Sequence, residues 1–571
     1  MLMSPTPEEA ALFENKILLD TYRQDPENSV EPVSEEERKL SYFDTSKEHL
    51  KYVLPFIPAN ILITGGILVS GKLLTDAGSE VISALPYIYG FYGLTQSANT
   101  LFVGTGVSAA NAHGEGDIGR INTILKQSMF IAGGLSIPYL AMLYQGGNIS
   151  TLIGAPNDVA NVVQTHLNQY GWGVPLYFVN AGLTQTTIPY STVPSSVNLI
   201  ANTLTSCGLS FLFTQGAGFI PPMPIAGTAL AISVTNALND LGFFGYMLSQ
   251  SRYREIMANN SDSSHMHSFK SIMNIGIPTA LNTFSQMASS MVATTTISAL
   301  LNETALQQQG LTTMPMAFLQ TLIAFNGDAA AVLISNQVGR QRYSELKKYV
   351  NTAHTFGAIS GVLGSALIAG LAGPYVEYFA DPSIATPEFI STTRNLLLLS
   401  SLNQTISSVG VTSSGALRGI DENWKPLLIN LGLKCGLNLL GSYLLISTTD
   451  LGVYSPYVSD LIVSSLFYTP SLYYYCRKKV SSYINEHTND DVESDLARSD
   501  DLEAGQLYNH DDVAVGQTHA NQQQTSYCSS FLGWLYPNSS RTTTSHDEAE
   551  NLTSEPEPSR STSWRGWFSF S

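Results

Sequence analysis

Charged residues are scarce over most of this 571-residue chain. Asp, Glu, Lys and Arg make up 13% of the sequence, and the net charge of −18 comes from its two ends. Residues 1–50 hold 12 acidic and 5 basic residues and residues 481–571 hold 15 and 4, which leaves 18 of each sign for residues 51–480. A soluble fold would have to bury that long apolar middle in one core, although single cores stop growing near about 250–300 residues. We therefore expect the middle of the chain to lie in a membrane.

Motifs that hold nucleotides, metals or disulfides are also missing. No G-x-x-x-x-G-K-[ST] loop occurs, so transport driven by ATP is not expected. The four cysteines show neither disulfide nor metal spacing, and His113 and His354 are isolated. The first 50 residues lack the apolar core of a cleavable signal peptide. We predict no enzyme activity, no cofactor, no bound metal and no nucleic-acid partner.

Apolar stretches long enough to cross a bilayer fill residues 51–480. They lie near 52–75, 82–110, 123–146, 162–188, 194–215, 223–249, 270–299, 312–337, 350–375, 390–415, 426–447 and 455–476. A crossing helix needs roughly 20 mainly apolar residues, because hydrocarbon offers no partners for its backbone groups. The sequence predicts an all-α, polytopic membrane protein with twelve transmembrane helices.

Lys and Arg collect in alternate connections between these stretches. Arg252 and Arg254 lie in one connection, Arg340 and Arg342 in another, while the intervening connections carry mainly Asp and Glu. Basic residues accumulate on the cytoplasmic side of a membrane. The pattern therefore predicts that both termini are cytoplasmic.

Three pairs of short motifs recur in the same order in both parts of the chain. They are Phe56–Asn60 with Gly276–Ala280, Asn111–Gly114 with Asn336–Gly339, and Pro194 and Asn198 with Pro426 and Asn430, at offsets of 220, 225 and 232. Six spans in each part predict two parallel six-helix repeats, residues 51–255 and 256–480. An acidic cytoplasmic segment, residues 1–50, precedes them and a disordered acidic cytoplasmic tail, residues 481–571, follows. Substrate sites in such folds tend to lie between the repeats.

Several motifs resemble those of the multidrug and toxin extrusion (MATE) transporters, within the multidrug/oligosaccharidyl-lipid/polysaccharide exporter superfamily. They are Gly415–Gly419 followed by Pro426, Gly227–Ala231 in the sixth span, Ile277–Pro278 opening the seventh, and Gln337–Arg340 closing the eighth. The resemblance covers roughly residues 50–480. It implies a V-shaped pair of six-helix bundles that expels organic cations, or other small amphipathic solutes, by antiport with Na⁺ or H⁺.

The chain departs from that family at two positions. Bacterial members commonly carry an Asp in the first helix, where this chain has Gly66. Many members carry a Glu in the seventh helix about eight residues after its proline, and Pro278 is followed at that distance by Gln286. The usual cation-handling positions have therefore lost their charge, and coupling would have to use other residues.

Three ionisable residues inside the spans are candidates, because charge at membrane depth is costly. Asp328 and Asp240 are predicted to bind Na⁺ or exchange a proton, and Lys434 is predicted to be a counter-charge. Alternatively, each Asp is held structurally by Asn and Ser or by Lys434. If Asp328 couples transport, Asp328→Asn should abolish ion-driven efflux while leaving the protein in the membrane.

Five amide side chains in the spans are predicted to line a wet substrate cavity. They are Gln286, Asn282, Asn180, Asn202 and Asn236. Hydrogen bonds that hold the helices together are an equally good explanation for each of them.

The function predicted by this resemblance is secondary active efflux of a small organic substrate, in contact with membrane lipid. Two alternatives are a lipid-linked sugar flippase and a non-transporting scaffold or secreted bacterial effector with a degenerate transporter core. The tail contains two aromatic segments, residues 531–536 and 564–568, and a Glu-rich stretch near its end, which suggest protein partners. The expected location is the bacterial inner membrane, or a host membrane if the chain is secreted.

Overall fold

The computed structural model describes residues 41–75, 79–152, 155–216, 218, 220–259, 265–301, 303–380 and 386–507. The aromatic segments and the Glu-rich stretch predicted as partner sites lie outside these residues. Every regular element given below is a helix. Ala497 ends the first of two compact units, and the architecture described here belongs to that unit.

The described residues of the first part of the chain form a series of α-helices and a short 3₁₀ turn. They are α2 (Tyr42–Val53), α3 (Phe56–Thr75), α4 (Ser79–Asn99), η1 (Thr100–Phe102), α5 (Val103–Glu115), α6 (Ile118–Tyr144), α7 (Gly146–Leu152), α8 (Asn157–Gly171), α9 (Val174–Thr187), α10 (Val193–Gln215) and α11 (Ala226–Ser249). A short helix, α12 (Ser251–Ala258), follows the sixth predicted span.

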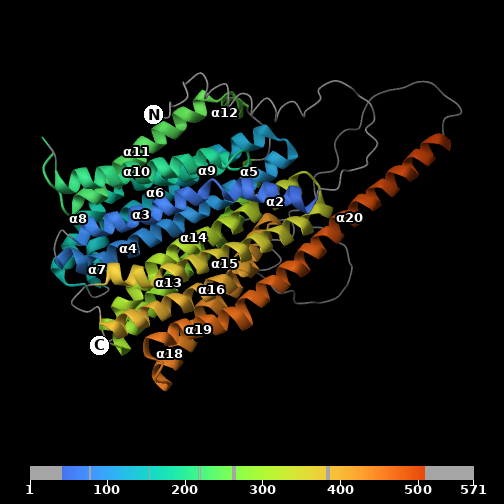
Figure 1. Cartoon of the computed structure of the whole chain (residues 1–571). Helices are drawn as coiled ribbons and strands as arrows, with labels where there is room; N and C mark the ends of the chain where they lie inside the picture. The colour runs from blue at the N-terminus through green and yellow to red at the C-terminus, as the bar shows by residue number, and fades with distance from the viewer. Residues whose placement is uncertain are drawn as a thin grey trace, which may run out of the picture. The chain divides into compact units, whose positions relative to one another are not determined.

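The second part contains longer helices. They are α13 (His265–Leu300), α14 (Glu303–Gly339), η2 (Tyr343–Glu345), α15 (Leu346–Phe379), α16 (Pro387–Gly419), α17 (Trp424–Ile429), η3 (Asn430–Leu437), α18 (Asn438–Thr448), η4 (Gly452–Tyr454), α19 (Ser455–Val463), η5 (Ser464–Tyr468) and α20 (Thr469–Leu507). Figure 1 shows the long helices of both parts running side by side along one common direction.

Each predicted span coincides, within the described residues, with one long helix or with consecutive short ones. The second span is α4, η1 and α5, the fourth is α8 and α9, and the eleventh is α17, η3 and α18. Within the part of the chain that the structure describes, four helical stretches are long and apolar enough to cross a membrane on length and composition alone: Val193–Gln215, Gln307–Gly339, Tyr343–Phe379 and Trp424–Thr448. Large apolar side chains such as Phe130, Ile137 and Leu241 remain over 70% exposed, as lipid-facing residues would be.

Packing is dense within each part of the chain. In the first, α10 packs on α3 and α11, α6 packs on α9, and α8 packs on α4 and α11. In the second, α14, α15 and α16 pack on one another, and α18 packs on α19. The boundaries predicted for the two repeats stay a prediction.

The two parts meet along a seam in which α5 packs against α13 and α14. A methyl group added at Gly114 would overlap the carbonyl oxygen of Asn336, and one added at Gly339 would overlap that of Asn111. These four residues belong to the two motifs that repeat at an offset of 225. Glycine is required at both positions because the backbones touch there.

The helix α2, which precedes the first span, docks on α14 and α15 of the second part. Ser41 and Asp44 form a capping box at its start. Thr45 Oγ1 lies 2.9 Å from Thr352 Oγ1, and the Tyr349 hydroxyl donates to Glu48 at 2.5 Å. The chain therefore begins its described part by joining the far repeat rather than its own.

Candidate ion-coupling site

Gly66 stands at the first-span position where other family members carry an acidic residue, and α10 packs directly against it. A Cβ added at Gly66 would lie 2.8 Å from Thr203 Cγ2 and 3.2 Å from Cys207 Sγ, both on α10. A carboxylate at this position would need α10 to move. On α13, Gln286 is half-buried and adjoins Ser285, whose hydroxyl accepts a hydrogen bond from Asn430 at 3.3 Å. Neither position offers a negative charge for a cation.

Asp240 on α11 is a buried carboxylate without a closed hydrogen bond. Asp240 is 7% exposed, and both of its carboxylate oxygens lack a hydrogen-bond partner among the described residues. The amide of Asn180 on α9 faces it without closing a bond of ordinary geometry. A buried carboxylate that is neither paired nor hydrogen-bonded is unfavourable as an anion, so it gains by taking up a cation or a proton.

Asparagine side chains surround this carboxylate on α9, α10 and α11. Asn198 Nδ2 donates to Asn180 Oδ1 at 3.0 Å, and Asn202 Nδ2 donates to Asn236 Oδ1 at 3.3 Å. The first bond joins α10 to α9 and the second joins α10 to α11. Asn202 follows Asn198 by one turn of α10, and Asp240 follows Asn236 by one turn of α11. The structure thus groups three of the predicted amides with Asp240.

The other two predicted cavity amides lie elsewhere. Asn282 and Gln286 are on α13, which packs on α4, α5 and α6 rather than on α9 to α11. Asn282 is half-buried, and its Oδ1 has no hydrogen-bond partner among the described residues. A role for these two in substrate binding stays a prediction.

Asp328 on α14 is paired, and its partner is Arg418 at the end of α16. Arg418 Nη2 lies 3.1 Å from Asp328 Oδ1. The helices approach closely there, since a methyl group added at Gly415 would overlap the carbonyl group of Gly327. The ion pair therefore ties α14 to α16 inside the second part of the chain, and the partner is not Lys434.

Lys434 has a different partner, which the sequence analysis did not single out. Its Nζ lies 2.6 Å from Asp460 Oδ1 on α19. A signal was present in the sequence, because Asp460 is the acidic residue inside the span predicted at 455–476. Among the described residues, no group of three or more His, Cys, Asp and Glu side chains is placed to hold a metal ion.

A family model, MatE, matches residues 55–212 and 278–444, which together make up more than half of the chain. The chain belongs to the MatE family. Its matched segments begin at 55 and 278, one in each part of the chain.

Two curated relatives of this MatE chain are named as bacterial multidrug resistance proteins. It is 23% identical over 397 residues to a probable multidrug resistance protein NorM of Bradyrhizobium diazoefficiens, covering 66% of this chain and 82% of that one. It is 21% identical over 428 residues to the multidrug resistance protein MdtK of Edwardsiella ictaluri, covering 72% and 90%.

Solved structures share the fold of this MatE chain. An outward-facing MATE transporter superposes with a TM-score of 0.70 at 15% identity, covering 77% of this chain and 97% of that one. A transporter of the same superfamily from Pyrococcus furiosus, described as having a binding pocket of reversed polarity, gives 0.69 at 16% identity and covers 77% and 96%. The predicted all-α transporter fold and the resemblance to MATE proteins are confirmed, and the chain is an integral membrane transporter.

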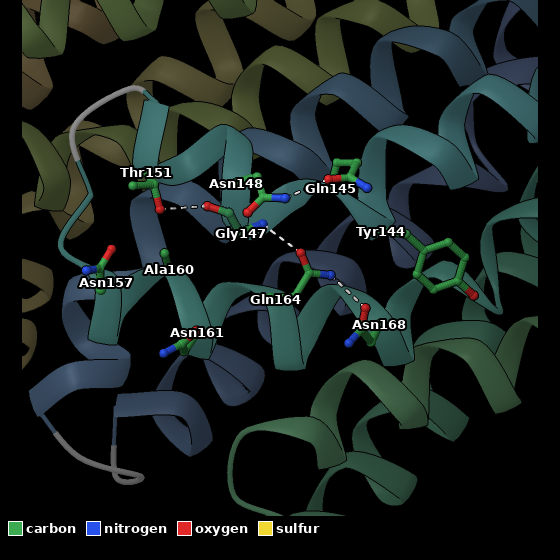
Figure 2. Close-up of a pocket in the computed structure, with 10 residues that line it drawn as sticks. All are labelled: Tyr144, Gln145, Gly147, Asn148, Thr151, Asn157, Ala160, Asn161, Gln164 and Asn168. Carbon is green, nitrogen blue, oxygen red and sulfur yellow. Dashed lines mark hydrogen bonds between the residues drawn. The ribbon is translucent and has the colours of Figure 1, made fainter.

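A polar cavity of about 500 Å³ in this MatE chain lies between the end of α6, α7 and α8 (Figure 2). Gln164 accepts a hydrogen bond from the Gly147 amide at 2.7 Å and donates to Asn168 at 2.6 Å. Its ten lining residues include six Asn and Gln amides and none that is charged. The cavity therefore lacks the negative charge that an ion-coupling site requires.

Proposed function

We propose that this chain is a secondary active transporter that exports amphipathic organic cations, or other small amphipathic solutes, in exchange for Na⁺ or H⁺. The names of its relatives favour multidrug efflux as the activity. The observation that carries the coupling is the buried and unpaired carboxylate of Asp240. We assign Asp328 instead to holding α14 against α16, because Arg418 already neutralises it.

The coupling proposal follows from what Asp240 can hold. A desolvated carboxylate such as that of Asp240 suits either a proton or the hard cation Na⁺, which prefers oxygen ligands. Binding of either ion would neutralise the charge at Asp240, and its release would restore that charge. A cationic substrate and the coupling ion would then bind the transporter in alternation, as antiport requires.

Alternating access would use the seam between α5 and α14. The two parts of the chain touch there through backbone contacts at Gly114 and Gly339. Rocking of one part against the other would open this seam and expose the substrate to the inner side. The alternation of basic residues between connections supports a seam on the cytoplasmic side, with both termini cytoplasmic. The bacterial sources of the relatives favour the inner membrane of a bacterium as the location.

The test is flux in liposomes that contain the full chain, with ethidium as substrate and imposed Na⁺ or H⁺ gradients. We expect wild-type protein to move ethidium against one of these gradients, and Asp240→Asn to lose the ion-driven component. Asp328→Asn is the matched control, since it removes a second membrane carboxylate that already has a partner, and its remaining flux should keep its ion dependence. Ion-driven flux that survives Asp240→Asn but disappears in Asp328→Asn would transfer the coupling role to Asp328.

A further inference from the structure

The ammonium group of Lys434 occupies a site that has the features of a cation receptor. Lys434 Nζ lies 2.6 Å from Asp460 Oδ1 and 2.6 Å from the hydroxyl oxygen of Ser464. It also lies 5.6 Å from the centre of the Tyr468 ring. A carboxylate, a hydroxyl and an aromatic ring together form a favourable environment for an ammonium ion.

Two amides hold the carboxylate of this site in place. Asn403 on α16 donates to Asp460 Oδ2, and Asn438 on α18 donates to Oδ1 at 3.2 Å. Asp460 is therefore positioned by residues other than Lys434. The receptor half of the site would persist if the lysine side chain left.

Both helices widen into a π-helix at this site. Lys434 lies in the π-helical stretch η3, and Ser464 and Tyr468 bound the π-helical stretch η5. Such stretches are rare in helices and occur often at functional sites.

The site faces the inside of the helix bundle. Polar residues recur every four positions along the eleventh span, at Asn430, Lys434, Asn438 and Ser442, and each is buried or half-buried. Most large exposed side chains of the same span are apolar and include Leu431, Leu440 and Leu444. The remaining exposure of the ion pair, 19% for Lys434 and 27% for Asp460, therefore opens toward the interior and not toward lipid.

The fold itself does not require a charged pair at this place. At the repeat offset of 232, Lys434 corresponds to Asn202, which lies in the first half of the chain. Asn202 donates to Asn236 at 3.3 Å, so the equivalent residue of the first half reaches the following span through a neutral amide. The charge in the second half is an addition that packing alone does not explain.

The partial exposure of the pair makes exchange of its cation feasible. A fully desolvated ion pair is costly to break, whereas a pair that keeps some exposure is weaker. A second cation that reaches Asp460 can therefore compete with Lys434, whose long side chain can swing away.

We propose that Asp460, Ser464 and Tyr468 form a binding site for the ammonium group of a transported organic cation, and that Lys434 occupies this site when no substrate is present. The substrate class is a monovalent amine with an apolar body, and its ammonium group displaces Lys434 from Asp460. This inference rests on the proposed function in taking the substrate to be a cation. It adds a second-half site, distinct from the coupling carboxylate Asp240.

The first test replaces the lysine by a free amine. Lys434→Ala vacates the site, and n-butylammonium reproduces the four carbons and the charge of the lost side chain. We expect n-butylammonium to raise the Tm of the full-length variant in detergent, because a ligand that binds only the folded state stabilises it. n-Butanol is the neutral control, and Lys434→Ala with Asp460→Asn is the variant without a receptor. A shift no larger than that of n-butanol, or an equal shift in the double variant, would overturn the proposal.

The second test measures affinity directly and does not depend on Lys434→Ala folding. Dansylcadaverine, a fluorescent primary amine on a five-carbon chain, is titrated into purified full-length protein. Lys434→Met removes the competing ammonium while keeping the length of the side chain, so binding should tighten about tenfold. Adding Asp460→Asn to that variant should remove the gain. Equal or weaker binding to Lys434→Met would show that the pair is only a structural tie.

The two proposals fail separately. If wild-type protein moves no ethidium in liposomes but n-butylammonium rescues Lys434→Ala, the export proposal is wrong and the cation site stands. If ethidium flux is ion-driven but neither Lys434 variant responds to an amine, the cation site is wrong and the export proposal stands.

Discussion

Asn111 and Asn336 make the same contact in opposite directions across the seam between α5 and α14. Asn111 Nδ2 donates to the carbonyl oxygen of Ser335 at 3.5 Å, and Asn336 Nδ2 donates to that of Ala110 at 3.2 Å. The two asparagines are equivalent positions of the internal repeat, and so are their two acceptors. The two halves are therefore related by a local two-fold axis at this seam. Each half donates an asparagine amide to a backbone carbonyl oxygen of the other.

Closure of this seam should be sensitive to a single methyl group. In Gly339→Ala the new Cβ overlaps the carbonyl oxygen of Asn111, and overpacking of this kind costs about 1–3 kcal/mol. We expect the inner ends of α5 and α14 to separate and ethidium flux to fall about tenfold. Pulsed electron–electron double resonance between spin labels on the two helix ends measures the distance between them. Gly373→Ala on α15 is the control, because nothing lies within 4 Å of its added Cβ; an unchanged distance distribution in Gly339→Ala would contradict the prediction.

Docking of α2 should weaken in acid. His49, which precedes the first span, is buried between Asn326, at 3.2 Å from its Nε2, and the ring of Phe356. Burial lowers the pKa of His49 from 6.5 to about 4, and the hydrogen bond to Asn326 opposes that shift. The undocked helix therefore binds a proton more readily than the docked one. The stabilisation is complete above about pH 6.5 and decreases as the pH falls toward 4, by up to about 3 kcal/mol.

Hydrogen exchange of the α2 amides as a function of pH tests this expectation. Protection should fall between pH 6.5 and 4 in the wild type. His49→Gln keeps a hydrogen-bonding group but does not titrate, so its protection should stay flat over the same range. A wild-type profile as flat as that of His49→Gln would show that His49 does not control the docking.

The helix α3, which forms the first span, should tolerate a larger side chain at Gly65 but not at Gly66. Gly65→Ala meets nothing within 4 Å and removes a flexible residue from α3, so it should be neutral or stabilising by about 0.5–1 kcal/mol. Gly66→Ala meets Thr203 and Cys207 and should destabilise by about 1–3 kcal/mol. Thermal unfolding of the two variants in detergent measures the difference. Equal Tm values would mean that α10 yields freely, and the first-helix acidic site of other family members could then be rebuilt at Gly66.

The architecture could be predicted because a span is a local property of the sequence. Each span needs only a run of apolar residues, and the repeat was visible in short motifs such as Asn111–Gly114. The division of the eleventh span into α17, η3 and α18 was not predicted. The π-helical stretch η3 contains Lys434, which contacts Asp460 on a neighbouring helix. A pattern within one span carries no information about such a contact.

Partners of the membrane charges were the least predictable feature. Asp328 and Arg418 are 90 residues apart in the sequence, and their contact depends on the crossing of α14 and α16 at two glycines. The partner of Asp460 could not be predicted, because its contact with Lys434 joins two spans and depends on how α18 packs on α19. The asparagines around Asp240 were identified singly, and only the packing of α9, α10 and α11 shows that they act as one group.

The docking of α2 on the far repeat has a consequence for biosynthesis. Thr45 emerges from the ribosome 307 residues before its partner Thr352, which at about 5–20 residues per second is roughly 15–60 s of translation. During that interval α2 has no binding surface, while the spans of the first repeat enter the membrane one after another. The helix α2 is therefore made early but can dock only late, after the eighth and ninth spans have been inserted.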